Sequence, residues 1–265
     1  MIKANNVCVH FPKEQGQFIF RKEYQQILHD VSFTVEKGEC LGILGESGSG
    51  KSTLGRVMCS LLKPFKGSME IDGLDLYNSK ESLAPGTLAV VFQDYTTSVN
   101  TRFTVRDIIN ESFTVLKRRT GESIDVDAEC IKLLELVGLN EDFLYRYPHQ
   151  LSGGQLQRVC IARAIAVKPQ IILFDEAISS LDAHTQVQIM DLLKEIKAMY
   201  GFTYVFITHD LPSVTYLCDR VLFLYKGVVE EILPVAQISE AKSEYAQKLL
   251  HSILDIKHDQ VRTII

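Results

Sequence analysis

The chain has 265 residues, of which 46% are hydrophobic and 23% are charged, as expected for a globular protein with a well-buried core. Lys and Arg total 28 against 33 Asp and Glu, so the net charge is −5, which argues against general nucleic-acid binding. No apolar run approaches the roughly 20 residues that cross a bilayer, and the start of the chain lacks the apolar core of a secretory signal. The six cysteines include no C-x-x-C pair, a pattern typical of reduced thiols in an apolar core.

The N-terminal region, residues 1–44, predicts an antiparallel β layer. Short apolar runs such as Asn6–Phe11 and Asp30–Val35 alternate with turns. The polar and aromatic segment 12–26 between them has no assigned role.

A phosphate-binding motif follows this layer. Residues 45–52 read Gly-Glu-Ser-Gly-Ser-Gly-Lys-Ser, which matches G-x-x-x-x-G-K-[ST], with a strand-like run before it (39–44) and helical spacing after it (53–62). Inward-pointing amides would cradle phosphates, Lys51 would meet the β- and γ-phosphates, and the Ser52 hydroxyl would ligate Mg²⁺. The strand and helix on either side disfavour the alternative, a glycine-rich turn with a chance Lys-Ser pair. The candidate nucleotide-binding residues are Gly45, Glu46, Ser47, Gly48, Ser49, Gly50, Lys51, Ser52 and Thr53.

Residues 94–160 predict a helical region inserted into this core. Helical apolar spacing runs over 105–117 and 127–137, with Gly121 and Gly138 as stops. At its end, Leu151–Gln155 (Leu-Ser-Gly-Gly-Gln) precedes a plainly helical segment, and a serine with two glycines at a helix start forms a second anion site. Ser152 alone is equally typical of an ordinary N-cap.

Strands and helices alternate again from 161 to 230, which predicts a parallel α/β core. Residues 231–265 predict a tail that consists of a loop, a helix around 244–254 and a polar end. The run Ile171–Glu176 is apolar and ends in two acids, so we expect it to be a buried strand with ligands beyond its carboxyl end. Asp175 would hold Mg²⁺ and Glu176 would polarise the attacking water as a general base. The alternative is that acids follow strands because loops are polar.

The ordered set of motifs resembles the nucleotide-binding subunit of an ABC transporter over nearly the whole chain. The set comprises Gly45–Ser52, Gln93, Leu151–Gln155, Ile171–Glu176, Ser180–Asp182 and His209. The resemblance implies that Ser152, Gly153, Gly154 and Gln155 act on the γ-phosphate of ATP held by the other subunit of a head-to-tail dimer. It further implies that Gln93 contacts Mg²⁺ and the water, that Asp182 signals across the dimer, and that His209 contacts the γ-phosphate.

The residues within and beside these motifs are similar to those of the dipeptide, oligopeptide and nickel importer branch of the family. Within that branch, they are most like the second ATPase of such a system. Val91–Asn100, Tyr147–Gln150, Phe206–Leu211 and Glu244–Leu250 carry this likeness. The branch usually has proline where Tyr95 stands and Asn-Pro where Asn100-Thr101 stands, and many longer relatives have a cysteine cluster near the C-terminus.

The adenine needs an aromatic face, and Phe11 matches the stacking position of the family. Phe18, Phe20 or Tyr24 are alternatives, as is core packing of Phe11.

The implied fold is α/β, a RecA-like P-loop NTPase core (1–93 and 161–230) with an antiparallel β layer, a helical subdomain (94–160) and a tail (231–265). The implied protein is an ATPase that drives uptake of nickel, a metal chelate or short peptides, using ATP and Mg²⁺. Its partners would be a second ATPase subunit, identical or a sister chain, two multi-pass permease subunits and an extracytoplasmic solute-binding protein, at the cytoplasmic face of the membrane. An exporter ATPase, a soluble non-transport ABC ATPase and a non-transport P-loop enzyme are the alternatives.

Overall fold

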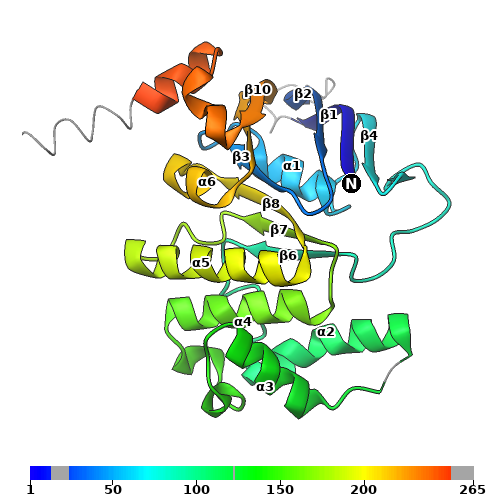
Figure 1. Cartoon of the computed structure of the whole chain (residues 1–265). Coiled ribbons are helices and arrows are strands. Elements are labelled where there is room, and N and C mark those ends of the chain that lie inside the picture. The colour runs from blue at the N-terminus through cyan, green and yellow to red at the C-terminus, as the bar shows by residue number, and fades with distance from the viewer. Residues whose placement is uncertain (13–23, 122, 252–265) are drawn as a thin grey trace, which may run out of the picture.

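Two β-sheets and the helices around them make up the protein, for which the computed structural model describes residues 1–12, 24–121 and 123–251 (Figure 1). A four-stranded antiparallel sheet has the order β2-β1-β4-β5, and a six-stranded sheet has the order β10-β9-β3-β8-β7-β6. The strands are β1 (Ile2–Pro12), β2 (Tyr24–Val35), β3 (Cys40–Leu44), β4 (Lys66–Ile71), β5 (Leu74–Asp75), β6 (Leu88–Phe92), β7 (Ile171–Asp175), β8 (Thr203–Thr208), β9 (Arg220–Tyr225) and β10 (Val228–Pro234). The α-helices are α1 (Lys51–Met58), α2 (Val105–Thr120), α3 (Val126–Leu136), α4 (Gly153–Ala166), α5 (Ala183–Tyr200) and α6 (Leu211–Leu217).

The six-stranded sheet is buried on both faces because two separate apolar clusters cover it. Leu41 and Ile43 of β3 face one cluster, shared with α1 and the antiparallel sheet. Cys40 and Leu44 of the same strand face the other cluster, shared with α2 to α6. Alternate residues of a strand point to opposite faces, so the near-continuous apolar runs of β3, β7 and β8 are what a doubly covered parallel sheet requires. The predicted parallel α/β core is confirmed.

The predicted antiparallel β layer is also confirmed, but its strands differ from the expected ones. β1 pairs with β2 and with β4, so residues 66–75 belong to the layer, whereas β3 lies in the other sheet. Helix α1 begins at Lys51, inside the phosphate motif, and ends at Met58 rather than near residue 62.

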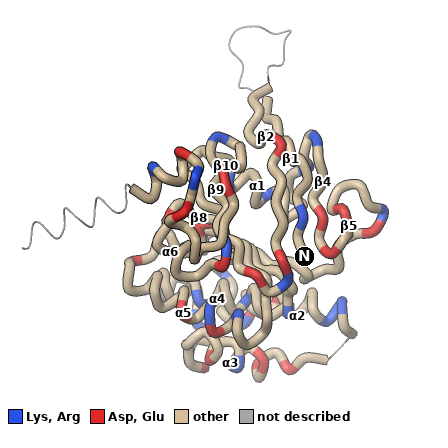
Figure 2. The backbone as a smooth tube through the Cα atoms, turned by 45° about the horizontal axis from the view of Figure 1, so that its top comes forward, with Lys and Arg blue, Asp and Glu red and all other residues tan. Residues whose placement is uncertain are grey.

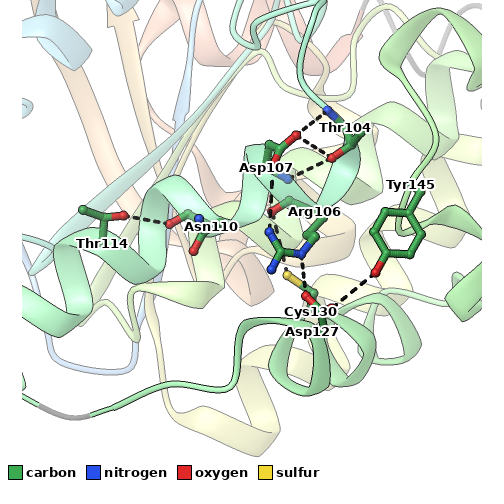
Figure 3. Close-up of polar contacts among 8 residues, drawn as sticks. All are labelled: Thr104, Arg106, Asp107, Asn110, Thr114, Asp127, Cys130 and Tyr145. Atoms are coloured by element: carbon green, nitrogen blue, oxygen red, sulfur yellow. Dashed lines mark hydrogen bonds and ion pairs between the residues drawn. The ribbon is translucent and has the colours of Figure 1, made fainter.

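Helices α2 and α3 pack together on α4, and a polar network holds their N-terminal turns (Figure 3). Arg106 forms an ion pair with Asp127, whose other carboxylate oxygen accepts a hydrogen bond from the Tyr145 hydroxyl at 3.2 Å. Helix α4 continues past residue 160, where the sequence placed the boundary of the helical region, and contacts strand β6. The helical region and the core therefore share one helix.

The segment expected to be a loop after residue 231 instead completes a strand. β10 pairs antiparallel with β9 as far as Pro234, followed by a 3₁₀ segment (Val235–Glu240) and a helix that is described over 244–251. The rest of the predicted tail lies outside the described residues.

Acidic and basic residues are interspersed along the tube, and the last turn of α2 carries three consecutive basic residues, Lys117, Arg118 and Arg119 (Figure 2). Over residues 1–12, 24–121 and 123–251, no helix is long and apolar enough to cross a membrane.

Helix α2 depends on a capping box at Thr104, where the hydroxyl accepts a hydrogen bond from the Asp107 amide and the Asp107 carboxylate accepts one from the Thr104 amide at 3.1 Å. We expect Thr104→Ala to lower the free energy of unfolding by about 1 kcal/mol, because the Asp107 amide and the Asp107 carboxylate each lose a hydrogen bond to the Thr104 hydroxyl. Chemical denaturation measures this loss.

Thr114→Ala is the matched control on the same helix. The Thr114 hydroxyl donates to the Asn110 carbonyl, one turn back (Figure 3), and alanine is the better helix former. A loss as large in Thr114→Ala as in Thr104→Ala would contradict the capping role.

Candidate active site

Four strands of the six-stranded sheet end at one edge, and each is followed by a predicted site segment. β3 and β8 are parallel with Leu44 opposite Thr208, so the phosphate motif and His209 leave the sheet side by side. β6 and β7 are parallel with Phe92 opposite Asp175, which sets Gln93 beside the two acids. The carboxyl edge of a parallel sheet is where ligands bind in open α/β folds.

The phosphate loop has a conformation that favours glycine at two points. Gly48 and Gly50 have φ values of +81° and +104°, and a Cβ on Gly50 would lie 2.8 Å from Leu28 Cδ2. At Gly45 a Cβ would lie 2.3 Å from the Leu224 carbonyl oxygen. The loop therefore follows a tight path from β3 into α1.

Lys51 lies under this loop, with its side chain only 4% exposed. Its Nζ donates to the carbonyl oxygens of Gly45 and Glu46 at 2.8 and 2.9 Å and lies 3.7 Å from Glu176 Oε1. Burial lowers the pKa of Lys51, and the carboxylates of Glu176 and Asp175 oppose that shift. The sequence-predicted lysine and the sequence-predicted base are thus direct neighbours.

Asp175 is the last residue of β7, and its Oδ1 is buried without a hydrogen-bond partner among the described residues. Burial raises the pKa of this carboxyl group, and the charge of Glu176 adds to the rise. A buried carboxylate oxygen without a partner is the kind of ligand that Mg²⁺ prefers, since this cation binds oxygen. The Asp175 carboxylate therefore fits a magnesium site.

Glu176 adopts a φ of +48°, in the left-handed region that non-glycine residues rarely occupy. Its amide donates to the Ile207 carbonyl at 2.9 Å, which fixes the backbone to β8. Its Oε2 lies 3.4 Å from His209 Nδ1. Strained backbone of this kind gathers at functional sites, where the surrounding structure imposes it.

Gln93 joins Glu176 through a residue that the sequence did not single out. Gln93 Nε2 donates to the Ser179 hydroxyl at 3.4 Å, and this hydroxyl donates to the Glu176 carbonyl at 2.9 Å. In the sequence, this contact is indicated only by the position of Ser179, which follows Glu176 by three residues, the spacing of a turn.

A cavity of about 300 Å³ lies over the loop and reaches from Phe11 to Glu176. It brings together the loop and the base, but the described residues lining it include none from 152–155. Phe11 lines it, whereas Tyr24 does not, and Phe18 and Phe20 lie outside the described residues. The lining residues are Phe11, Ile27, Ser47, Gly48, Gly50, Lys51, Ser52, Thr53 and Glu176.

Ser152 and Asp182 are both N-caps. Ser152 forms a capping box with Gln155 at the start of α4, and Asp182 accepts hydrogen bonds from the amide and hydroxyl of Thr185 at 3.0 and 2.7 Å. The two helix starts touch, since a Cβ on Gly154 would lie 2.7 Å from Thr185 Cγ2. This arrangement leaves the amides at the start of α4 on a partly exposed surface.

Comparison with known proteins connects this geometry to one family. The family model described as "ABC transporter" matches residues 28–179. The metal-staphylopine import system ATP-binding protein CntF of Staphylococcus aureus is 40% identical over 255 residues, covering 96% of this chain and 99% of that protein. The oligopeptide transport ATP-binding protein AppF of Bacillus subtilis is 39% identical and covers 96% of this chain and 78% of that protein.

Solved structures agree with these relatives. A dimeric structure of MJ0796, a bacterial ABC transporter cassette, is 30% identical with a TM-score of 0.76, covering 89% of this chain and 99% of that one. A second dimeric structure of the same cassette, in a post-hydrolysis state with ADP and phosphate, has a TM-score of 0.75 at the same identity and coverage.

The buried Asp175 carboxylate predicts a pH-dependent gain in stability for Asp175→Asn. The folded-state pKa of Asp175 is raised above its value of 3.8 in the unfolded chain, so the folded protein loses stability as the pH rises from that value through the folded pKa. Asparagine does not ionise. We therefore expect Asp175→Asn to raise the Tm at pH 7, by an amount that shrinks as the pH falls toward 4.

Asp182→Asn is the control with the opposite sign. Hydrogen bonds from Thr185 lower the pKa of Asp182, so its ionised form stabilises the fold above the unfolded pKa, and that contribution is lost as the pH falls. Asn is also a good N-cap, so a small loss of Tm at pH 7, or none, is expected. A Tm of Asp175→Asn below that of the parent at pH 7 would contradict the buried-charge account.

Proposed function

Because the chain belongs to the ABC transporter family, as an ATP-binding ATPase of its importer branch, we propose that it drives uptake of a short peptide or a metal chelate through separate membrane subunits. The support for the solute class is the function for which the relatives are named. One of them serves metal-staphylopine import and another serves oligopeptide transport, at 40% and 39% identity. The two values are too close to choose between these solutes.

One observation carries the proposed chemistry: the carboxylate of Glu176 lies 3.7 Å from Lys51 Nζ and borders the cavity over the phosphate loop. Lys51 meets the phosphates of ATP, and Glu176 accepts a proton from the attacking water as the general base. His209, 3.4 Å from the other Glu176 oxygen, orients this carboxylate and reaches the γ-phosphate.

The remaining nucleotide contacts follow from the cavity. The amides of the loop residues that line the cavity, within 47–53, bind the phosphates, and Phe11, at the far end of the same cavity, stacks on the adenine. Asp175, Ser52 and Gln93 would hold Mg²⁺, which neutralises phosphate charge when bound. Positioning and electrostatic stabilisation supply most of the rate enhancement in phosphoryl transfer.

The second half of the site comes from a partner subunit in this proposal. Ser152, Gly153, Gly154 and Gln155 do not line the cavity of their own chain, but their amides start a 14-residue helix. They bind the γ-phosphate of ATP held by a second ATPase subunit, identical or a sister chain, in a head-to-tail dimer, with Asp182 at the same interface. The similar cassette MJ0796 forms dimers in its solved structures.

The proposed full system has two multi-pass permease subunits and an extracytoplasmic solute-binding protein, with this chain at the cytoplasmic face of the membrane. Loss of the γ-phosphate loosens the dimer, and the helical region, which is joined to the core through α4, passes the movement to the permeases.

We predict that Glu176→Gln binds ATP and accumulates a closed dimer while its turnover falls by roughly 10²- to 10⁴-fold, because the amide cannot accept the proton. Single-turnover hydrolysis and size-exclusion chromatography measure the two effects. Lys51→Ala is the comparison variant, since it should lose ATP binding in an equilibrium titration. Turnover by Glu176→Gln near the parental rate would remove Glu176 as the base.

The transport role is tested by purifying tagged Glu176→Gln protein with ATP from detergent-solubilised native membranes and identifying the bound chains by mass spectrometry. We expect two multi-pass proteins and a second ATPase subunit, and the solute is then sought with the binding protein encoded beside them. Lys51→Ala, which should not form the closed dimer, is the matched control. Recovery of soluble partners only would point to a non-transport ABC ATPase. Permeases whose genes have no solute-binding protein encoded beside them would point to an exporter.

A further inference from the structure

The C-terminal tail contacts the phosphate loop through one tyrosine. The amide of Glu46, the second residue of the loop, donates a hydrogen bond to the Tyr245 hydroxyl at 3.0 Å. These residues are 199 positions apart in the chain, and Tyr245 lies in the helix described over 244–251. A loop amide that bonds to a side chain of the tail is unavailable for a phosphate, so this contact fixes the loop rather than the ligand.

The helix that carries Tyr245 is itself held in place. The Glu231 carboxylate, on β10, accepts hydrogen bonds from the amides of Lys242 and Ser243, both at 2.8 Å. The Ser243 hydroxyl then accepts one from the Ala246 amide at 3.1 Å. These bonds satisfy three amides at the start of the helix and attach it to the edge strand of the six-stranded sheet.

The ring of Tyr245 is also packed. It stacks on Tyr225, the last residue of β9, with ring centroids 4.5 Å apart and an angle of 24° between the planes. Burial raises the pKa of Tyr245, so the hydroxyl stays neutral at physiological pH. The position of the hydroxyl is therefore set by β9, β10 and the stacked rings together.

Both ends of the loop are fixed from this side of the molecule. The Gly45 carbonyl, which is in the same peptide group as the Glu46 amide that Tyr245 holds, accepts from Lys51 Nζ at 2.8 Å. The Glu46 carbonyl accepts from the same Nζ at 2.9 Å. Near the other end, the Gly227 amide, in the turn after β9, donates to the Ser49 carbonyl at 2.9 Å. The peptide group on which Lys51 depends is thus the one that the tail holds.

We propose that Tyr245 is a positioning residue for nucleotide binding, which holds the first turn of the phosphate loop, and with it Lys51, in the conformation that accepts phosphates. The inference rests on the proposed function only in taking 45–53 as the phosphate site. Without the bond, the loop divides its time among several conformations. The apparent Kd then rises in inverse proportion to the fraction that remains competent.

Titration of the full-length chain with MgADP, which is not consumed, tests this directly. Tyr245→Phe removes the hydroxyl but keeps the stacked ring. We expect the Kd for MgADP to rise on the order of 3- to 10-fold, the range for one lost hydrogen bond, with an unchanged number of sites. Tyr225→Phe is the matched control, because it removes the hydroxyl of the other ring in the stack. This hydroxyl forms no hydrogen bond among the described residues, so the Kd should be unchanged.

The outcomes are separable. If the parental chain does not bind MgADP, the proposed function fails. If it binds but Tyr245→Phe has the parental Kd, or loses Tm and binding sites without a change in Kd, then Tyr245 has no positioning role.

Glu231→Ala provides the second variant, because it removes the anchor of the helix without touching the loop. We expect it to raise the Kd in the parental chain and to add little in the Tyr245→Phe background, since both changes act through the same bond. If the fold-changes in Kd of the two single variants multiply in the double variant, Glu231 does not act on the loop through Tyr245.

Discussion

The alignment of four parallel strand ends at one edge of the six-stranded sheet is the constraint on which the site depends. β3, β7 and β8 are buried on both faces, so none of them can shift its register without moving a whole apolar set. The partly buried edge strand β6 is held in register by its parallel pairing with β7. This rigidity fixes the backbone of the phosphate loop, Gln93, Asp175 and His209 relative to one another. Only the side chains beyond the edge remain to be positioned by local contacts.

Those side chains include charges that the fold does not fully compensate. Lys51 is almost completely buried beside Glu176, and Asp175 has an oxygen without a partner among the described residues. Burial opposes the charged form of each group, so the folded chain retains this arrangement at a cost in stability. A site prepared for a highly charged ligand has this character, because a nucleotide and its cation supply the missing counter-charges.

The phosphate loop is supported from the C-terminal half of the chain as much as from its own strand and helix. β9 approaches Gly45 so closely that no side chain fits there, and the turn after β9 and the tail helix bond to Ser49 and Glu46. The amides of the loop are thus divided between those that remain free for a ligand and those that hold the loop in place. This division explains how a short, glycine-rich segment keeps one conformation.

The sequence by itself determined the phosphate loop, the acids after β7, the helix start at Ser152 and the α/β class, because glycine, capping and apolar patterns are local signals. It predicted the helical run 156–166, which α4 contains, although the boundary of the helical region was placed inside it at residue 160. It did not predict the true limits of α1 or the strand nature of residues 231–234. Nor did it find Ser179 or Tyr245, since their partners, Gln93 and Glu46, are far away in the chain. Tertiary structure alone decided these contacts, because strand order and the packing of the tail on β9 and β10 determine which distant residues meet.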